Sequence, residues 1–368
     1  MAVALIYRDE LTQYDFGIGH PLRGDRYRKF IPLLKQHLEE GRHYIIEKAD
    51  PATEEDLLTI CDRDYIEFTR DFYHAFYFGQ IYDDRFYRYH SSDNMPQPGA
   101  GKLEEAARFI IGQAKLAADL IMSGRYIQTI VIGGGTHHAH RNYGEGFCIY
   151  NDVAFVARYL LNHYGLERIL ILDTDAHAGN GTADYFYAEP RVLFVDIHQN
   201  PATLYPGSGF ANEIGTGAGK GFTINIPLPV NAGLDSYITV FEEIVEPVVR
   251  EFQPQIIIRN GGSDPHFADG LTELGLTTKG FQTLGQKVKN LTQICEGREI
   301  DMIASGYNNQ VLPYAWLALI SGVTGFPVNV EEVIPVPAQY ERDNSLPLTQ
   351  QVISDVKRYL KDYWKCFR

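Results

Sequence analysis

Short, continuously apolar segments rich in β-branched residues recur along this chain and limit its fold more than any other property. Seven of them stand out: Val3–Tyr7, Ile127–Ile132, Arg168–Leu172, Val192–Ile197, Phe222–Ile226, Gln255–Ile258 and Asp301–Ala304. Continuous rather than alternating hydrophobicity is typical of strands that are buried on both faces. The segments therefore predict a parallel sheet in the core of an α/β protein.

Segments with helical periodicity separate several of these predicted strands. The clearest are Leu103–Met122, Val153–Tyr164, Ser236–Glu251 and Lys279–Cys295. Glycines follow the first two of them, as expected where a helix ends. The alternation of strands and helices predicts a three-layer fold, in which a parallel sheet carries helices on both faces.

The chain is expected to form a single domain over residues 1–368. Of its 368 residues, 45% are hydrophobic and 12% aromatic, a composition that allows a large buried core. No internal repeat of about 20 to 50 residues and no low-complexity tract divides it. Within the domain, residues 333–368 are expected to form an extended connector followed by an amphipathic helix at Thr349–Trp364, packed on the body.

Charge and cysteine usage narrow the class of protein. The formal net charge is −14, from 33 Lys+Arg and 47 Asp+Glu, which argues against direct binding of nucleic acid. The four cysteines are scattered without a C-x-x-C pair, so a reducing, cytoplasmic location is expected. The apolar run Met1–Tyr7 lacks the preceding basic residues of a signal peptide, and no run approaches the about 18 apolar residues of a membrane span. Neither secretion nor membrane association is expected.

Polar, glycine-rich segments directly follow four of the predicted strands. They are Gly133–His140, Asp173–Gly181, Arg259–Asp264 and Ser305–Asn308. In open α/β sheets, ligands bind beyond the carboxyl ends of the strands, where the loops converge on a crevice. We therefore expect the four segments to meet at one site.

Asp175 and His177 are the strongest candidates for metal ligands. Residues two apart in an extended segment project to the same side, so the carboxylate and the imidazole can hold one ion. With Asp264 after another strand, they form a set of two carboxylates and one imidazole that leaves a position open for water, as a catalytic divalent ion requires. For the pair alone, the alternative interpretation is that Asp175 caps a helix and His177 is a hydrogen-bonded core residue.

The tandem histidines His137 and His138 predict acid–base chemistry. An imidazole titrates near pH ~6.5, so it can take a proton from a water molecule and later give it to a leaving amine. Asp173 and Asn180 could each accept a hydrogen bond from a histidine ring, one with a full charge and one without, which would give the two histidines different basicities. Tyr307, after a Ser-Gly turn, could donate its hydroxyl to a developing oxyanion.

The same residues resemble those of the zinc-dependent histone deacetylase superfamily, which also includes acetoin-utilisation proteins, acetylpolyamine amidohydrolases and arginases. The matching motifs are Tyr14–Arg26, Gly133–Asp152, Leu172–Thr182, Tyr205–Gly209, Gly261–Thr277 and Ser305–Trp316, and they span nearly the whole chain. The resemblance implies the arginase/deacetylase fold. It implies zinc ligands at Asp175, His177 and Asp264, and a catalytic set of His137, His138, Tyr307, Asp173 and Asn180.

A narrow tunnel for an acetyl-lysine side chain is implied as well. The residues matched to the tunnel and its surroundings are Gly146, Phe147, Tyr205, Leu271, Asp93 and Arg26. Asp93 matches an aspartate at the rim that holds the substrate backbone, and Arg26 matches the lining of an inner acetate channel. Leu271 stands where polyamine-specific members carry an acidic gatekeeper, so a polyamine preference loses support. A potassium site near Asp173, Asp175, His177 and Asp196 is also implied.

These features predict a zinc-dependent deacetylase that hydrolyses the acetyl amide of acetyl-lysine in proteins or of a small acetylated amine. The alternatives are an acetylpolyamine amidohydrolase, an arginase-like dimetal hydrolase, a nucleotide-binding module on Gly133–Gly135 and an inactive acetyl-lysine reader. The histidine pair and Tyr307 argue against the arginase-like enzyme, and the missing G-x-G-x-x-G pattern argues against the nucleotide module. The sequence makes no prediction of oligomeric state.

Overall fold

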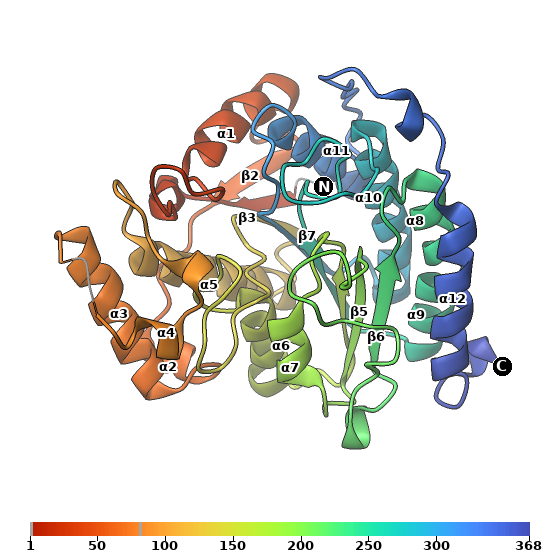
Figure 1. The fold of residues 1–368 in the computed structure, drawn as a ribbon, viewed down its shortest axis with the longest axis horizontal. Coiled ribbons are helices and arrows are strands. Elements are labelled where there is room, and N and C mark those ends of the chain that lie inside the picture. Colours follow the sequence, from red (N-terminus) through yellow and green to blue (C-terminus); the bar gives the residue numbers. More distant parts are fainter. Residues whose placement is uncertain (1–2, 81–82) are drawn as a thin grey trace.

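The computed structural model describes residues 3–80 and 83–368, and in them the chain forms an eight-stranded parallel sheet between two layers of helices (Figure 1). The strands are β1 (Val3–Ile6), β2 (Tyr44–Glu47), β3 (Gln128–Ile132), β4 (Ile169–Asp173), β5 (Val192–Gln199), β6 (Thr223–Leu228), β7 (Ile256–Gly261) and β8 (Glu299–Ile303). Their order is β2-β1-β3-β8-β7-β4-β5-β6. The predicted α/β fold with a buried parallel sheet is confirmed. Residues 1–2 and 81–82 of the predicted domain lie outside the described residues.

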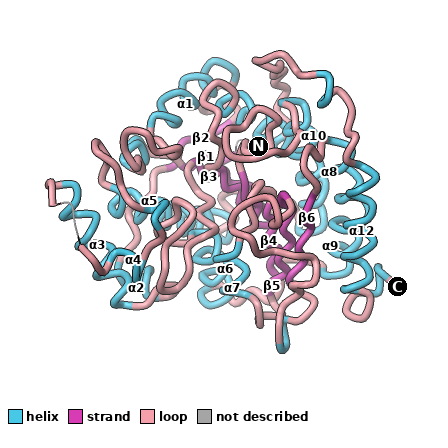
Figure 2. Tube along the Cα trace, viewed as in Figure 1, coloured by secondary structure: helices cyan, strands magenta, loops and turns pink. Residues whose placement is uncertain are grey.

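Helices cover both faces of this sheet (Figure 2). One layer holds α5 (Leu103–Met122), α6 (Asp152–His163) and α7 (Asn180–Phe186), with α2 (Glu54–Leu58), α3 (Arg63–Tyr77) and α4 (Phe86–Tyr89) beyond them. The other holds α1 (Asp25–His37), α8 (Leu234–Val240), α9 (Glu246–Phe252), α10 (Thr278–Thr292), α11 (Leu312–Thr324) and α12 (Leu346–Leu360). Each layer buries its apolar side chains against the strands, so the core lies on both sides of the sheet.

Two elements show where the periodicity signal fails. β2 has four residues at the edge of the sheet, and Ile45 within it is 38% exposed, so it lacks the long apolar run of a buried strand. α11 is buried on nearly all sides, and a helix that is apolar all round shows no amphipathic period.

The helix predicted at Ser236–Glu251 is interrupted by a π-helical segment, Phe241–Val245, between α8 and α9.

The C-terminal segment packs on the body of the molecule. α12 lies against α8 and β6, and Nε1 of Trp364 beyond it donates to the carbonyl oxygen of Gly221 at 2.7 Å. Before α12, residues 333–345 form an irregular connector with one short 3₁₀ turn, Ala338–Tyr340. The single-domain organisation stays a prediction.

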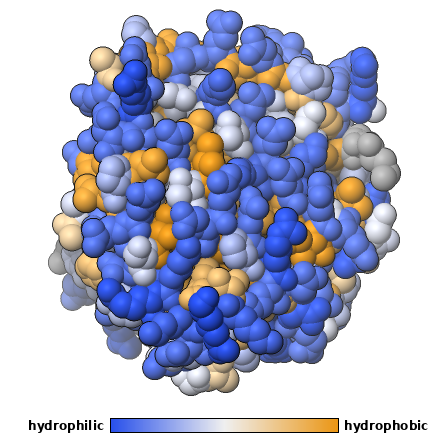
Figure 3. Space-filling model, turned by 90° about the vertical axis from the view of Figure 1, so that its right-hand side faces the viewer, coloured by the Kyte–Doolittle hydropathy of each residue, from blue (hydrophilic) through white to orange (hydrophobic). Residues whose placement is uncertain are grey.

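Within the described ranges, no helix is both long and apolar enough to traverse a bilayer. The face that carries α12 is largely hydrophilic, with apolar side chains in small separate groups (Figure 3). That face therefore carries no broad apolar patch.

A buried ion pair links the two central strands β7 and β8. Arg259 and Asp301 are register partners, both are fully buried, and Nε of Arg259 donates to Oδ1 of Asp301 at 2.5 Å. The sequence grouped Arg259 with the polar loop after β7, but the strand continues to Gly261, so Arg259 lies inside the sheet. Its charge is therefore paired inside the sheet and does not belong to the polar loop.

Asp301→Leu should lower the free energy of unfolding by about 3–5 kcal/mol, because it leaves the Arg259 guanidinium buried without a counter-charge. The double variant Arg259→Leu/Asp301→Leu removes both charges and should recover much of that loss. Urea denaturation followed by circular dichroism measures both effects. A single variant as stable as the wild type would contradict a buried, ionised pair.

Candidate functional site

The polar segments predicted to converge follow four strands that are neighbours in the sheet, β3, β8, β7 and β4. The chain runs outward from β4 to β6 and then returns with β7 and β8 between β4 and β3, which opens a crevice at the carboxyl ends of these strands. A cavity of about 30 Å³ lies there, lined by residues that include His137, His138, Asp175, His177, Ser305 and Tyr307. The structure thus brings the four segments together.

Asp175, His177 and Asp264 form a compact group of possible metal ligands. All three are buried, and one ligand atom from each lies within 4.8 Å of the others. Nδ1 of His177 is 3.1 Å from Oδ1 of Asp175 and 3.0 Å from Oδ2 of Asp264. Ser305 holds the other oxygen of Asp264 through its hydroxyl at 2.7 Å.

The electrostatics of this group favour a bound cation. Burial and the nearby charge of Asp175 raise the pKa of Asp264 to about 8. Two carboxylates in a dry site repel one another, so a divalent ion between them would remove a large electrostatic cost. Two carboxylates and one imidazole also form a donor set that suits zinc.

The paired histidines stand beside this group, each with its own partner. Nδ1 of His137 is 2.8 Å from Oδ2 of Asp173, and Nδ1 of His138 is 2.7 Å from Oδ1 of Asn180. The two Nε2 atoms are 3.1 Å apart. Nε2 of His137 also lies 3.8 Å from Oδ1 of Asp175, so the pair adjoins the candidate ligands.

The two histidines differ in basicity. Burial opposes the charged form of His137, but the carboxylates of Asp173 and Asp175 outweigh it and raise its pKa to about 9. Burial, followed by the charge of His137, holds the pKa of His138 well below its usual range. At neutral pH the arrangement therefore places a charged imidazolium next to a neutral imidazole, which is how two similar groups take different roles.

Tyr307 lies on another side of the same cavity. Its ring centroid is 6.3 Å from that of His177 and 5.8 Å from that of Phe147, in edge-on contacts. Burial, then the charges of Asp264 and Asp175, raise the pKa of the phenol well above its usual value, so the hydroxyl stays protonated and can donate.

Residues 20–323 match the model of the histone deacetylase domain, so the match covers most of the chain. The chain belongs to the histone deacetylase family. A family member described as a probable deacetylase, from Archaeoglobus fulgidus, is 34% identical over 375 residues, which cover 100% of both chains. The acetoin utilization protein AcuC of Staphylococcus aureus (strain MRSA252) is 36% identical over 328 residues, 88% of this chain and 82% of that protein.

A solved structure has the same fold as this chain. The crystal structure of the HDA15 HD domain superposes with a TM-score of 0.83 at 24% identity, and the match covers 100% of this chain and 97% of that one. The fold expected from the resemblance is thereby confirmed.

Two aromatic residues matched to the family tunnel flank the histidines. The ring of Tyr205 meets that of His138 edge-on at 5.1 Å and is 40% exposed. Phe147 adopts a positive φ of 65°, and its carbonyl oxygen accepts a hydrogen bond from the Tyr14 hydroxyl at 2.7 Å. Gly146 has a φ of 58°, and a Cβ there would lie 2.3 Å from Cδ2 of His138, so only glycine fits.

The other three residues matched to the family lie at different depths. Arg26 is buried, lines the cavity and donates to the carbonyl oxygen of Ala304 at 2.7 Å. Asp93 accepts from the backbone N–H of Gly146 at 3.0 Å and from the Ser91 hydroxyl, so it links its own loop to Gly146. Leu271 is 38% exposed and does not line the inner cavity.

Three supporting residues of the deacetylase site were not singled out from the sequence. Asn260 donates to Oδ2 of Asp173 at 2.9 Å, and Asp269 accepts from the backbone N–H of Tyr307 at 2.7 Å. Glu145 accepts from Nδ2 of Asn180 at 2.6 Å. Glu145 and Asp269 stand inside the matching motifs, and Asn260 stands in the polar segment Arg259–Asp264. Their place among acidic or amide residues close to the predicted site was the signal that could have found them.

Proposed function

We propose that this chain is a zinc-dependent amidohydrolase that removes the acetyl group from acetyl-lysine in proteins or from a small acetylated amine. The observation that carries the proposal is the adjacency of the Asp175–His177–Asp264 group to the His137–His138 pair around one cavity. Membership of the histone deacetylase family supports the reaction type. The donor set supports zinc.

A zinc ion held by Asp175, His177 and Asp264 would polarise the acetyl carbonyl and lower the pKa of a water molecule. The protein residues supply the proton transfers. His138 is neutral, and its Nδ1 hydrogen is bound by Asn180, so its Nε2 accepts the proton of the attacking water and later delivers it to the leaving amine. His137, held as an imidazolium by Asp173, stabilises the negative charge that develops next to it.

Tyr307 and Arg26 complete the proposed mechanism. The Tyr307 hydroxyl donates to the oxyanion of the tetrahedral intermediate. The Arg26 guanidinium lies 5.7 Å from the centre of the Tyr307 ring, and its positive charge suits the acetate product. The rings of Phe147 and Tyr205 would line the tunnel for the alkyl part of an acetyl-lysine side chain.

The rival enzymes receive less support. Among the described residues, the Asp175–His177–Asp264 group is the one set of three or more His, Cys, Asp or Glu side chains close enough to hold an ion, whereas an arginase-like enzyme needs ligands for two. Leu271 offers no charge to a polyamine. Neither a dimetal hydrolase nor a polyamine-specific enzyme is therefore preferred.

The proposal also covers the domain organisation, the cellular location and a structural ion. We propose one deacetylase domain over residues 1–368, acting in the cytoplasm, and all four cysteines being free thiols supports a reducing compartment. We also propose a structural potassium ion near Asp173, Asp175, His177 and Asp196. The carboxylate of Asp196 is buried, with Oδ1 3.0 Å from Nδ1 of His198 and Oδ2 accepting from the backbone N–H of Gly179 at 2.9 Å, and a negative charge at this depth suits a neighbouring cation.

A substrate panel tests the function. Acetyl-lysine peptides, longer acyl-lysine peptides, acetylpolyamines and small acetylated amides are incubated with the purified protein, and release of the free amine is measured. Turnover of acetyl-lysine or of a small acetylated amine is expected, and it should be lost with a zinc chelator and return with added Zn²⁺. Hydrolysis that resists the chelator would remove the metal from the mechanism, and turnover of acetylpolyamines alone would shift the substrate class.

Tyr307→Phe should lower kcat on an acetyl-lysine peptide by about 10²–10³-fold, because it removes one donor to the oxyanion. The ring contacts with His177 and Phe147 remain, so the thermal stability should change little. Steady-state kinetics and a thermal melt measure the two effects. Full turnover by this variant would show that the hydroxyl has no part in the reaction.

A further inference from the structure

Glu145 stands directly behind Asn180, on the side away from His138. Its Oε1 atom accepts from Nδ2 of Asn180 at 2.6 Å, while Oδ1 of Asn180 faces Nδ1 of His138 at 2.7 Å. A continuous hydrogen-bonded path therefore runs from the catalytic histidine through the amide to a carboxylate. Burial opposes the ionised form of Glu145, but the hydrogen bonds from His140 and Asn180 keep its pKa below the usual value.

His140 holds Glu145 in place from the outer side. Its Nε2 lies 2.9 Å from the same Oε1 atom, and its Nδ1 lies 2.6 Å from Oδ2 of Asp184. Burial disfavours the charged ring, yet the two carboxylates outweigh it and raise the pKa of His140 to about 9. His140 therefore donates from both nitrogens, one to each carboxylate.

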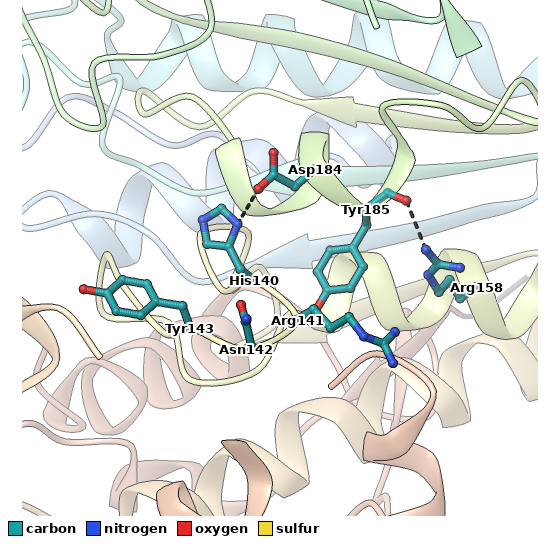
Figure 4. Close-up of a pocket in the computed structure, with 7 residues that line it drawn as sticks. All are labelled: His140, Arg141, Asn142, Tyr143, Arg158, Asp184 and Tyr185. Carbon is teal, nitrogen blue, oxygen red and sulfur yellow. Dashed lines mark hydrogen bonds and ion pairs between the residues drawn. The ribbon is translucent and has the colours of Figure 1, made fainter. Parts of the chain in front are cut away.

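This outer pair reaches the molecular surface. His140 and Asp184 line a pocket of about 450 Å³ together with Arg141, Tyr143 and Tyr185, and Figure 4 shows the His140 ring turned toward Asp184. The Asp184 side chain is 69% exposed. The network thus begins at a solvent-accessible carboxylate and ends at the buried His138.

The chemistry of these groups allows one arrangement of hydrogens. A carboxylate only accepts, so the amide of Asn180 must turn its NH₂ toward Glu145 and its oxygen toward His138. The oxygen in turn requires a hydrogen on Nδ1 of His138. The lone pair of the neutral ring is then on Nε2, the atom that lies 3.1 Å from Nε2 of His137.

We propose that Glu145, held by His140, is a positioning residue that sets the orientation of Asn180 and thereby the tautomer of His138. Glu145 supplies, from behind Asn180, the negative charge that an aspartate at position 180 would carry. The inference rests on the proposed function in that it assigns His138 as the proton carrier. Its structural half, the tautomer of His138, holds independently of which substrate is turned over.

Glu145→Gln tests the charge with almost no change of shape. Glutamine can donate as well as accept, so it no longer forces one orientation of Asn180. We expect kcat on an acetyl-lysine peptide to fall about 10-fold with little change in KM, at the lower end of the losses seen when partners behind an active histidine are removed. Asp184→Asn, on a side chain that is 69% exposed, should lower kcat in the same direction by about 3-fold.

A double variant that moves the carboxylate from position 145 to position 180 gives the decisive comparison. In Glu145→Gln/Asn180→Asp, the new carboxylate at position 180 accepts directly from His138, and the glutamine donates to it. The double variant should therefore recover most of the kcat that Glu145→Gln loses. A merely structural role for Glu145 predicts no such rescue, and a double variant slower than the single one would overturn the inference.

Histidine ¹⁵N NMR on the zinc-loaded protein reads the tautomer without substrate. The wild type should show His138 protonated at Nδ1, and Glu145→Gln should show a mixture of tautomers. Asp62→Asn is the control, because it removes a carboxylate that accepts a hydrogen bond at 2.6 Å from Arg141, the residue next to His140, and leaves Asn180 untouched. Its kcat and its histidine spectrum should equal those of the wild type. An unchanged His138 tautomer in Glu145→Gln overturns the inference even where turnover is detected, whereas absent turnover with the expected spectra contradicts only the deacetylase assignment.

Discussion

Asp264→Asn should lower turnover of an acetyl-lysine peptide by at least about 10³-fold, equivalent to about 4 kcal/mol of transition-state stabilisation. The substitution removes one of two carboxylates that would hold the divalent ion, and it keeps the size and shape of the side chain. The oxygen that accepts from Ser305 at 2.7 Å can be retained by asparagine. The loss therefore comes from the metal rather than from packing.

Metal content and stability separate this explanation from misfolding. Atomic emission should find about one zinc ion per wild-type chain and far less in Asp264→Asn. Added Zn²⁺ should raise the melting temperature of the wild type by mass action and leave that of the variant unchanged. Without metal, the variant should be at least as stable as the wild type, because burial and the charge of Asp175 already raise the pKa of Asp264 to about 8. Full zinc binding by this variant would contradict the ligand assignment.

Asp119→Asn provides a control for the loss of a carboxylate away from the candidate ligands. Asp119 lies near the end of α5, which leads into the amino end of β3 and so sits at the opposite edge of the sheet from the site. It accepts from the hydroxyls of Tyr159 and Tyr164. Its substitution should leave zinc content and turnover at wild-type values.

His138→Gln should lower kcat by about 10²–10⁴-fold, the usual contribution of a positioned general acid–base group. Glutamine can retain a hydrogen bond to Asn180, but it cannot take up and return a proton near neutral pH. Zinc content should be preserved because His138 is not among the candidate ligands. Kinetics at several pH values, together with metal analysis, measure these effects.

The control for this substitution is His163→Gln, at the exposed end of α6, where the ring stacks on Tyr159 at 4.8 Å. Its kcat should equal that of the wild type. A loss in His138→Gln of less than about 10-fold would contradict its role as the proton carrier and would direct attention to His137.

Much of the site was predictable because it follows from local rules. Asp175 and His177 come directly after β4, although they lie in a bend, where the backbone N–H of His177 donates to Oδ1 of Asp175 at 2.8 Å, and not in the extended segment expected from the sequence. Each of the four polar segments comes directly after an apolar run. Parallel strands place their carboxyl ends at one edge, so the convergence of these segments depends only on fold class. The central strands and the amphipathic helix α5 were predictable for the same reason, because periodic or continuous apolar patterns in the sequence indicate which of their residues are buried.

Other features depend on partners that are distant in sequence. β2 exists because its backbone pairs with β1 at the sheet edge, and α11 is apolar all round because α1 and α10 cover it. The placement of Arg259 inside β7 is decided by Asp301 on the neighbouring strand. No pattern within those segments reports these contacts.

The sequence by itself determined the reaction-bearing residue types, the parallel α/β architecture and the edge of the sheet where the site lies, because strand periodicity and spacing are local properties of the chain. Only the tertiary structure decided which carboxylate or amide faces each histidine, and that Glu145 and His140 stand behind Asn180. Basicity and tautomer depend on distances of about 3 Å between residues from different loops, and packing of the whole domain sets those distances.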